Sequence, residues 1–136
     1  KGPYIKNSYN EDGAFAILSG NARTYWPTTL YELAHETVHM LNPVPFQVNY
    51  LEEGFAVLFS MDMTREFTLH PIKPNDIYYR EAVRMVRMLD DNPYKAARMI
   101  RKKFNALSLA TEDQMEELFP NVRAEIIKKL CSTFGS

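Results

Sequence analysis

The sequence predicts a mainly helical α+β domain, in which a short N-terminal β-hairpin or small sheet packs on about six helices. Two observations set the order of the elements. Good strand formers are concentrated between residues 14 and 26, whereas helix caps and apolar positions at helical spacing recur from Pro27 to the end. The 136 residues are 46% hydrophobic, which is enough for one core and short for two. We therefore expect a single domain over residues 1–136.

Strand signals come first along the chain. Residues 1–12 are polar and rich in turn formers, and the apolar segment 14–19 then ends at a Gly-Asn turn. Residues 22–26 continue with threonine, tyrosine and tryptophan, which favour strands. The pattern predicts a hairpin or two short strands over residues 14–26.

The first predicted helix follows Pro27. Thr29 with Glu32 three places later has the form of a capping box, and Asn42-Pro43 must end the helix. At about 100° per residue, one apolar stripe forms along it, with His35 and His39 just beside the stripe. The members of the stripe are Leu30, Leu33, Ala34, Thr37, Val38 and Leu41.

The second predicted helix starts after Asn49 as its N-cap and runs through residues 50–60. Glu52 then occupies the third helical position, where a carboxylate folds back on the cap, and Glu53 is left to point elsewhere. A glycine inside a helix costs about 1 kcal/mol relative to alanine, so Gly54 indicates that another backbone approaches closely. Two helices that cross at a shared ion would need such an approach.

The rest of the chain predicts four more helices. One follows Asp76 and runs to about residue 89, and the next starts at Asn92-Pro93 and runs to about residue 104. A short helix capped by Thr111 ends before Pro120, and the last covers residues 121–134. The arginine and lysine runs on these helices are expected to face solvent.

Composition excludes several classes of protein. A formal net charge of −1 and a pI near 6.3 give no reason to expect nucleic acid or an acidic membrane as partner. No apolar run is long enough to span a membrane and no signal peptide is visible, so we expect a soluble chain, with compartment and oligomeric state left open. The lone Cys131 excludes an intrachain disulfide and is expected to be a small buried hydrophobe.

The most informative motif is HExxH at residues 35–39, on the first predicted helix. Side chains four residues apart lie one above the other on the same helix face, so the imidazoles of His35 and His39 can close on one ion, with Glu36 beside them. Three protein ligands plus water are typical of a catalytic zinc site. The motif therefore predicts a metal site that still needs a third ligand.

HExxH followed by YLEEGFA at residues 50–56 resembles the gluzincin group of zinc metallopeptidases, and the second string is similar to that of the zinc aminopeptidases in this group. The resemblance covers roughly residues 14–89. It implies a zincin-like catalytic core that binds one Zn²⁺ through His35, His39 and Glu53. It also implies hydrolysis of peptide bonds by a metal-activated water, with Glu36 as general base and then acid.

The resemblance also implies an electrophilic tyrosine. Zinc aminopeptidases have a helix that opens with Tyr-x-x-Gly, and Tyr79 fits this pattern with Ala82 in place of glycine. Tyr79 is therefore the first candidate to stabilise the oxyanion, with Tyr78 and His70 as alternatives.

The chain departs from the family in three places. The connection from His39 to Glu53 is short and contains two prolines, the motif that anchors a substrate's amino terminus is absent, and Val57 stands where many thermolysin-like enzymes have an aspartate. Exopeptidase specificity is therefore not implied. The expected partner is a peptide or protein substrate, which an edge strand at residues 14–20 would bind by pairing. The alternative is a catalytically inactive zincin-fold domain with a binding or regulatory role.

Overall fold

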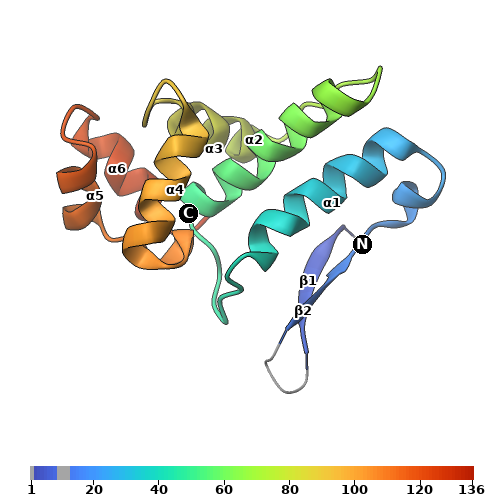
Figure 1. The fold of residues 1–136 in the computed structure, drawn as a ribbon, viewed down its shortest axis with the longest axis horizontal. Coiled ribbons are helices and arrows are strands. Elements are labelled where there is room, and N and C mark those ends of the chain that lie inside the picture. The colour runs from blue at the N-terminus through green and yellow to red at the C-terminus, as the bar shows by residue number, and fades with distance from the viewer. Residues whose placement is uncertain (1, 9–12) are drawn as a thin grey trace. The chain divides into compact units, whose positions relative to one another are not determined.

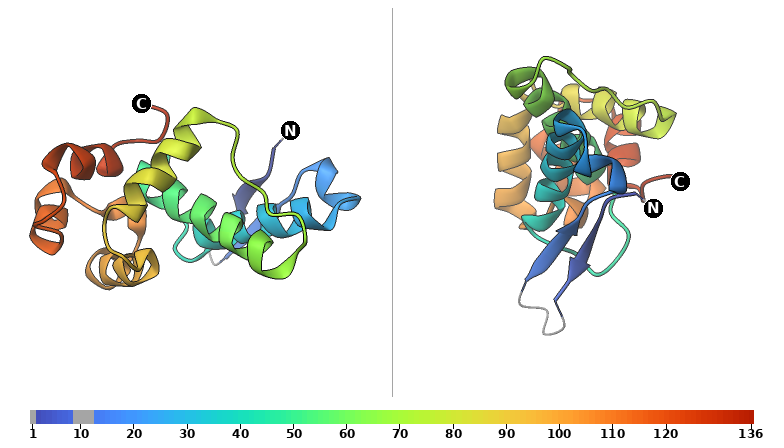
Figure 2. Two further views of the ribbon diagram at one scale, coloured as in Figure 1. Left: turned by 90° about the horizontal axis from the view of Figure 1, so that it is seen from above. Right: turned by 90° about the vertical axis from the view of Figure 1, so that its right-hand side faces the viewer.

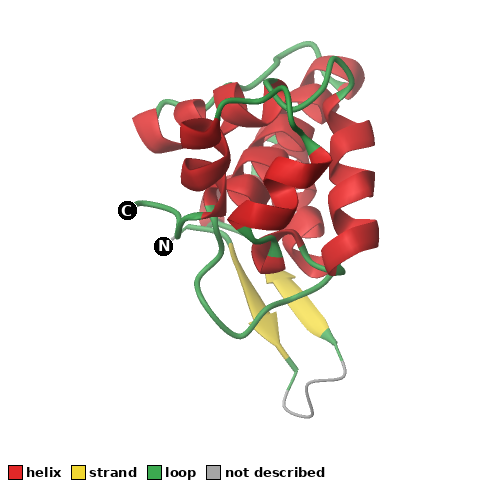
Figure 3. Ribbon diagram, turned by 90° about the vertical axis from the view of Figure 1, so that its left-hand side faces the viewer, coloured by secondary structure: helices red, strands yellow, loops and turns green. Residues whose placement is uncertain are grey.

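A computed structural model describes residues 2–8 and 13–136 and shows a mainly helical α+β protein, which confirms the predicted class (Figures 1 and 3). Within these residues, none of the helices is both long enough and apolar enough to cross a membrane. The elements are β1 (Tyr4–Asn7), β2 (Ala14–Ile17), the 3₁₀ helix η1 (Gly20–Arg23), α1 (Trp26–Met40), α2 (Tyr50–Phe67), α3 (Ile77–Arg87), α4 (Pro93–Phe104), the 3₁₀ helix η2 (Leu107–Leu109), α5 (Glu112–Leu118) and α6 (Ala124–Cys131).

The chain folds into two compact units. The first consists of Lys1–Pro43 and Ala56–Pro74, and the second of Val44–Phe55 and Asn75–Ser136. The helix α2 is continuous, and its residues 50–55 belong to the second unit while residues 56–67 belong to the first. The single domain expected from the sequence stays a prediction.

In the first unit, β1 and β2 form an antiparallel hairpin that packs on α1 (Figure 1). Tyr4 pairs with Ile17, and Asn7 pairs with Ala14. The prediction of strands over residues 14–26 was therefore wrong after Ile17, because the pairing partner of β2 comes from the polar segment before it. Part of that segment, residues 9–12, lies outside the described residues.

The start of α1 also differs from the prediction. The helix begins at Trp26 with Pro27 in its first turn, where a missing N–H is not needed, so Thr29 is not its N-cap. The Thr29 hydroxyl instead donates to the backbone carbonyls of Ala22 and Tyr25. The predicted end before Asn42 is confirmed, since α1 ends at Met40.

Glu32 has a tertiary role in place of the predicted capping role. Its carboxylate accepts the Ser19 backbone N–H at 3.0 Å and the Ser19 hydroxyl, and the side chain is 8% exposed. A buried carboxylate needs such donors, because water no longer solvates it. The pair ties the segment after β2 to α1.

The apolar stripe predicted for α1 is only partly buried: Ala34 is 4% exposed, but other members of the stripe face solvent. Leu33 and Leu41 are 43% and 51% exposed, whereas Glu32 and Glu36 are buried. The buried residues of α1 are therefore mixed, and the Glu32 carboxylate can be buried because Ser19 supplies donors for it. On the same helix, the Tyr31 carbonyl accepts the Ser60 hydroxyl of α2 at 2.8 Å, and the two helices lie side by side there.

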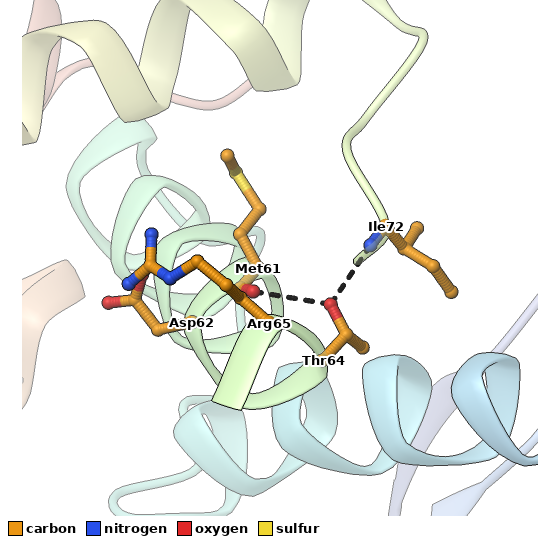
Figure 4. A network of polar contacts seen from close by, with 5 residues as sticks. All are labelled: Met61, Asp62, Thr64, Arg65 and Ile72. Carbon is orange, nitrogen blue, oxygen red and sulfur yellow. Dashed lines mark hydrogen bonds and ion pairs between the residues drawn. The ribbon is translucent and has the colours of Figure 1, made fainter. Parts of the chain in front are cut away.

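The end of α2 is tied to the segment that follows it (Figure 4). Thr64 is fully buried, and its hydroxyl donates to the Met61 carbonyl at 3.2 Å and accepts the Ile72 N–H at 3.0 Å. Arg65 and Asp62 form an ion pair at 2.8 Å with an exposed guanidinium. Thr64 therefore holds the chain as it turns back after the helix.

In the second unit, the predicted starts of α3 and α4 are confirmed. Asp76 accepts the N–H of Tyr78 at 2.8 Å, and Pro93 opens α4 after Asn92. The helices α5 and α6 pack on each other at one end of the unit (Figure 2). The core of this unit is apolar and includes Leu51, Phe55, Met85, Ile100, Met115, Ile127 and Leu130.

The last predicted helix is too long. α6 ends at Cys131, and the final residues pair with the segment that opens α2. Tyr50 donates its N–H to the Ser132 carbonyl at 3.0 Å, and Phe134 donates to the Val48 carbonyl at 2.9 Å. Backbone pairing between distant segments thus replaces the last turns of helix.

Gly54 has the close backbone neighbour that the sequence predicted. A Cβ atom at this position would lie 2.7 Å from the Ala82 carbonyl oxygen and 2.7 Å from the Val86 Cγ1. The neighbouring backbone belongs to α3, and not to the helix that carries the histidines. The glycine therefore serves the packing of α2 on α3.

Cys131 is expected to react slowly in the folded protein. Burial, with a smaller contribution from the charge of Glu112, raises the pKa of its thiol to about 11. Only the thiolate reacts, so at about pH 8 we expect alkylation by iodoacetamide to be about 100-fold slower than that of an ordinary thiol, and to speed up as pH rises toward 11. Mass spectrometry of timed reactions would measure this rate. Equal rates in the native and guanidinium-unfolded protein would contradict the prediction.

Candidate metal centre

The two histidines of HExxH converge on one side of α1. Their Nε2 atoms are 3.1 Å apart, and the ring centroids are 4.9 Å apart with the planes tilted by 59°. Both side chains are partly buried. The spacing of four residues on a regular helix puts both rings on the same face, as the sequence predicted, and their rotamers bring the Nε2 atoms together.

Glu36 lies on the same helix between the histidines. With 3.6 residues per turn, it is rotated by about 100° from His35 and by about 60° from His39 around the helix axis. Its side chain is 3% exposed. The motif thus places a buried carboxylate next to a pair of converging imidazoles.

Glu53 lies in the first turn of α2, which Asn49 caps as predicted. The Asn49 side-chain oxygen accepts the Glu52 N–H at 2.9 Å, and the Asn49 carbonyl accepts the Glu53 N–H at 3.2 Å. The Glu53 side chain is 9% exposed. Two consecutive buried glutamates at the start of a helix benefit from its positive N-terminal dipole.

The ligand atoms of His35, His39 and Glu53 all lie within 4.8 Å of one another, so this group could hold a metal ion. The helices explain why the third side chain belongs to it. The Ser60 hydroxyl of α2 donates a hydrogen bond to α1. Glu53 precedes Ser60 by seven residues, about two turns, on the same continuous helix, and therefore lies on the same helix face as Ser60. Among residues 2–8 and 13–136, this is the one such group of histidine, cysteine and acidic side chains.

Glu52, which was predicted to fold back on the cap, is linked to it through Ser108. Its carboxylate accepts the hydroxyl of Ser108 at 2.9 Å, and the Asn49 N–H donates to the same hydroxyl oxygen at 3.2 Å. Ser108 therefore stands between the two groups that a capping box would join directly. The sequence carries no signal for this residue, because it is 56 positions away from Glu52.

The tyrosine candidates lie at the start of α3. The ring of Tyr79 packs on Phe134 with a centroid distance of 4.8 Å, and Tyr78 lies 6.4 Å from the same ring with half of its surface exposed. Tyr79 is one turn before Ala82, whose carbonyl meets Gly54. The role of Tyr79 as oxyanion donor stays a prediction.

The other candidate, His70, lies apart from the group. It is exposed in the segment after α2, and its ring centroid is 6.1 Å from that of Tyr25. Its backbone N–H donates to the Thr68 hydroxyl. It is not a member of the group that could hold an ion. These features make His70 a suitable control residue.

Comparison with known proteins finds no family model, no curated protein and no solved structure that matches this chain.

Proposed function

We propose that this chain is a gluzincin-like zinc peptidase, which hydrolyses peptide bonds with Glu36 as general base and acid. The observation that carries the proposal is the convergence of His35, His39 and Glu53, with the ligand atoms within 4.8 Å. The buried Glu36 beside them and the YLEEGFA string at residues 50–56 add to it.

The donor set favours zinc. Two imidazole nitrogens and one carboxylate oxygen are ligands that Zn²⁺ accepts, and three protein ligands leave its fourth position for water or substrate. Zn–N bonds of about 2.0–2.1 Å at a tetrahedral angle separate two nitrogens by about 3.3 Å. The 3.1 Å between the Nε2 atoms is close to this value. It also fits an N–H···N bond between neutral rings, so the test must measure the metal itself.

The proposed reaction assigns a role to each of the residues around the group. A zinc ion bound there would lower the pKa of a water toward about 7. Glu36 would take a proton from the water that attacks the peptide carbonyl and would then deliver it to the leaving nitrogen. Tyr79 is proposed to donate a hydrogen bond to the developing oxyanion. The strand β2 would hold an extended substrate by edge pairing.

Metal binding tests the first step of the proposal. Protein loaded with zinc and then dialysed is expected to retain one equivalent, measured by atomic emission. His39→Ala and Glu53→Ala each remove one ligand and are expected to weaken binding at least about 100-fold. His70→Ala is the matched control, since His70 is an exposed histidine outside the group, and should bind as the wild type does. Wild-type protein that retains far less than one equivalent would refute the proposal.

A zinc-binding domain without turnover is the second candidate. One observation favours it: the position four residues after Glu53 is Val57, which is 1% exposed and cannot orient a histidine ligand by hydrogen bonding. Stoichiometric zinc with no cleavage across a broad peptide library would support this candidate over the peptidase.

A further inference from the structure

The first turn of α2 is held from outside the helix by the segment around η2. Ser108 accepts the Asn49 N–H at 3.2 Å and donates to the Glu52 carboxylate at 2.9 Å. Beside it, the Asn49 side-chain amide donates to the Leu107 carbonyl at 3.0 Å. Asn49 and Glu52 are 4% and 3% exposed, so bulk water cannot replace these bonds.

The hydroxyl of Ser108 is suited to this position because it both accepts and donates. The Asn49 N–H is one of the donors that a helix start leaves without an intrahelical acceptor. The Glu52 carboxylate, being charged, forms a stronger bond with the hydroxyl than a neutral acceptor would. A side chain without a hydroxyl would leave both of these buried groups without this partner.

The same turn carries the third member of the metal group. Glu53 follows Glu52 directly, and its N–H donates to the Asn49 carbonyl at 3.2 Å, the first bond of the helix. Any change in how Asn49 and Glu52 are held therefore moves the backbone from which the Glu53 side chain extends. The histidines, in contrast, lie in the middle and last turns of α1.

We propose that Ser108 is a positioning residue of the metal centre, which acts through Asn49 and Glu52 to aim the Glu53 carboxylate at the ion. The inference rests on the proposed metal site. Second-layer partners of metal ligands are typically worth about 10- to 100-fold in affinity, and Ser108 belongs at the lower end of this range because it acts through neighbouring residues.

A purely structural role for Ser108 predicts a different outcome. Loss of the hydroxyl would then lower the stability of the fold but leave the folded protein with unchanged metal affinity and an unchanged coordination geometry. Cobalt(II) distinguishes the two cases, because its visible absorption spectrum reports the number and arrangement of ligands, whatever the catalytic activity.

The experiment is a titration of Co²⁺ and Zn²⁺ into folded wild-type protein and a series of variants. Ser108→Ala is expected to raise the Kd for both metals about tenfold and to change the Co²⁺ spectrum, and Ser108→Thr, which keeps the hydroxyl, to restore both. Ser108→Cys, with a weaker hydrogen-bonding group of similar size, should lie between serine and alanine, and it keeps the series informative if the alanine variant does not fold.

Ser132→Ala is the matched control. It also removes a partly buried serine hydroxyl from the second unit, but that hydroxyl donates to the Lys129 carbonyl, at 2.7 Å. It should bind both metals as the wild type does. Wild-type affinity and spectrum in folded Ser108→Ala would overturn the positioning role alone. Absence of metal binding by the wild type would instead overturn the proposed metal site, and with it this inference.

Discussion

Replacement of Glu36 by glutamine is expected to lower the rate of peptide cleavage about 10³-fold while one equivalent of zinc stays bound. Glutamine has nearly the same shape as glutamate, but it cannot take a proton from the attacking water. Glu36 is not one of the three proposed ligands, so its replacement leaves them in place. Turnover of a fluorogenic peptide pool, measured on protein of known zinc content, would show the separation of chemistry from metal binding.

Glu32→Gln is the control for this experiment. Glu32 is also a buried glutamate of α1, one turn before Glu36, but its carboxylate is occupied by Ser19. Its replacement is expected to lower the stability of the fold. The turnover of the folded protein should stay within about twofold of the wild-type value, because Glu32 takes no part in the proposed chemistry. Cleavage by Glu36→Gln at the wild-type rate would rule out the general base that we propose.

Replacement of Gly54 by valine is expected to lower the free energy of unfolding by about 3 kcal/mol or more. The new Cβ would lie 2.7 Å from the backbone oxygen of Ala82, and this atom cannot turn aside as a side chain can. The helices α2 and α3 would have to separate. Because Glu53 is the neighbouring residue, metal affinity should fall together with stability.

Two further variants test whether the loss of stability in Gly54→Val comes from its close contact with α3. Gly20→Val adds the same side chain where nothing lies within 4 Å of the Cβ position, so it should change stability by about 0.5 kcal/mol or less. Val86→Ala in the Gly54→Val background removes one of the two obstacles and should recover only part of the loss, since the Ala82 carbonyl remains. Urea denaturation would measure all four proteins. Equal stability of the two glycine variants would contradict the close packing of α2 on α3.

The starts of α2, α3 and α4 were predicted correctly because each depends on groups only a few residues apart. Asn49 accepts an N–H three residues ahead, Asp76 accepts one two residues ahead, and Pro93 follows Asn92 directly. A capping bond or a proline at the first helical position acts as soon as the local segment becomes helical. The local sequence therefore contains the information that sets where these helices start.

The incorrect predictions have the opposite cause, because each concerns residues whose partners are far away in the chain. Glu32 was assigned to a capping box, but its partner is Ser19, 13 residues away, and the end of the last helix is set by the pairing of residues 132–134 with residues 48–50. The strand β1 was missed because it has only four residues and lies in a polar segment. Such a segment becomes a strand only when β2 lies beside it. The apolar stripe of α1 predicted the burial of Ala34, but it did not predict that Glu32 and Glu36 are buried while Leu33 and Leu41 are exposed.

The sequence by itself determined the mainly helical class and the pairing of the two histidines, since a spacing of four on a helix places both imidazoles on the same face. It also named Glu53, through the capping of α2 and the resemblance to gluzincins. Only the tertiary structure decided which side chains gather around these residues. It brought the ligand atoms of His35, His39 and Glu53 within 4.8 Å, placed Ala82 against Gly54, and put Ser108 between Asn49 and Glu52. These contacts join residues far apart in the chain, and they form only when packed helices bring those residues together.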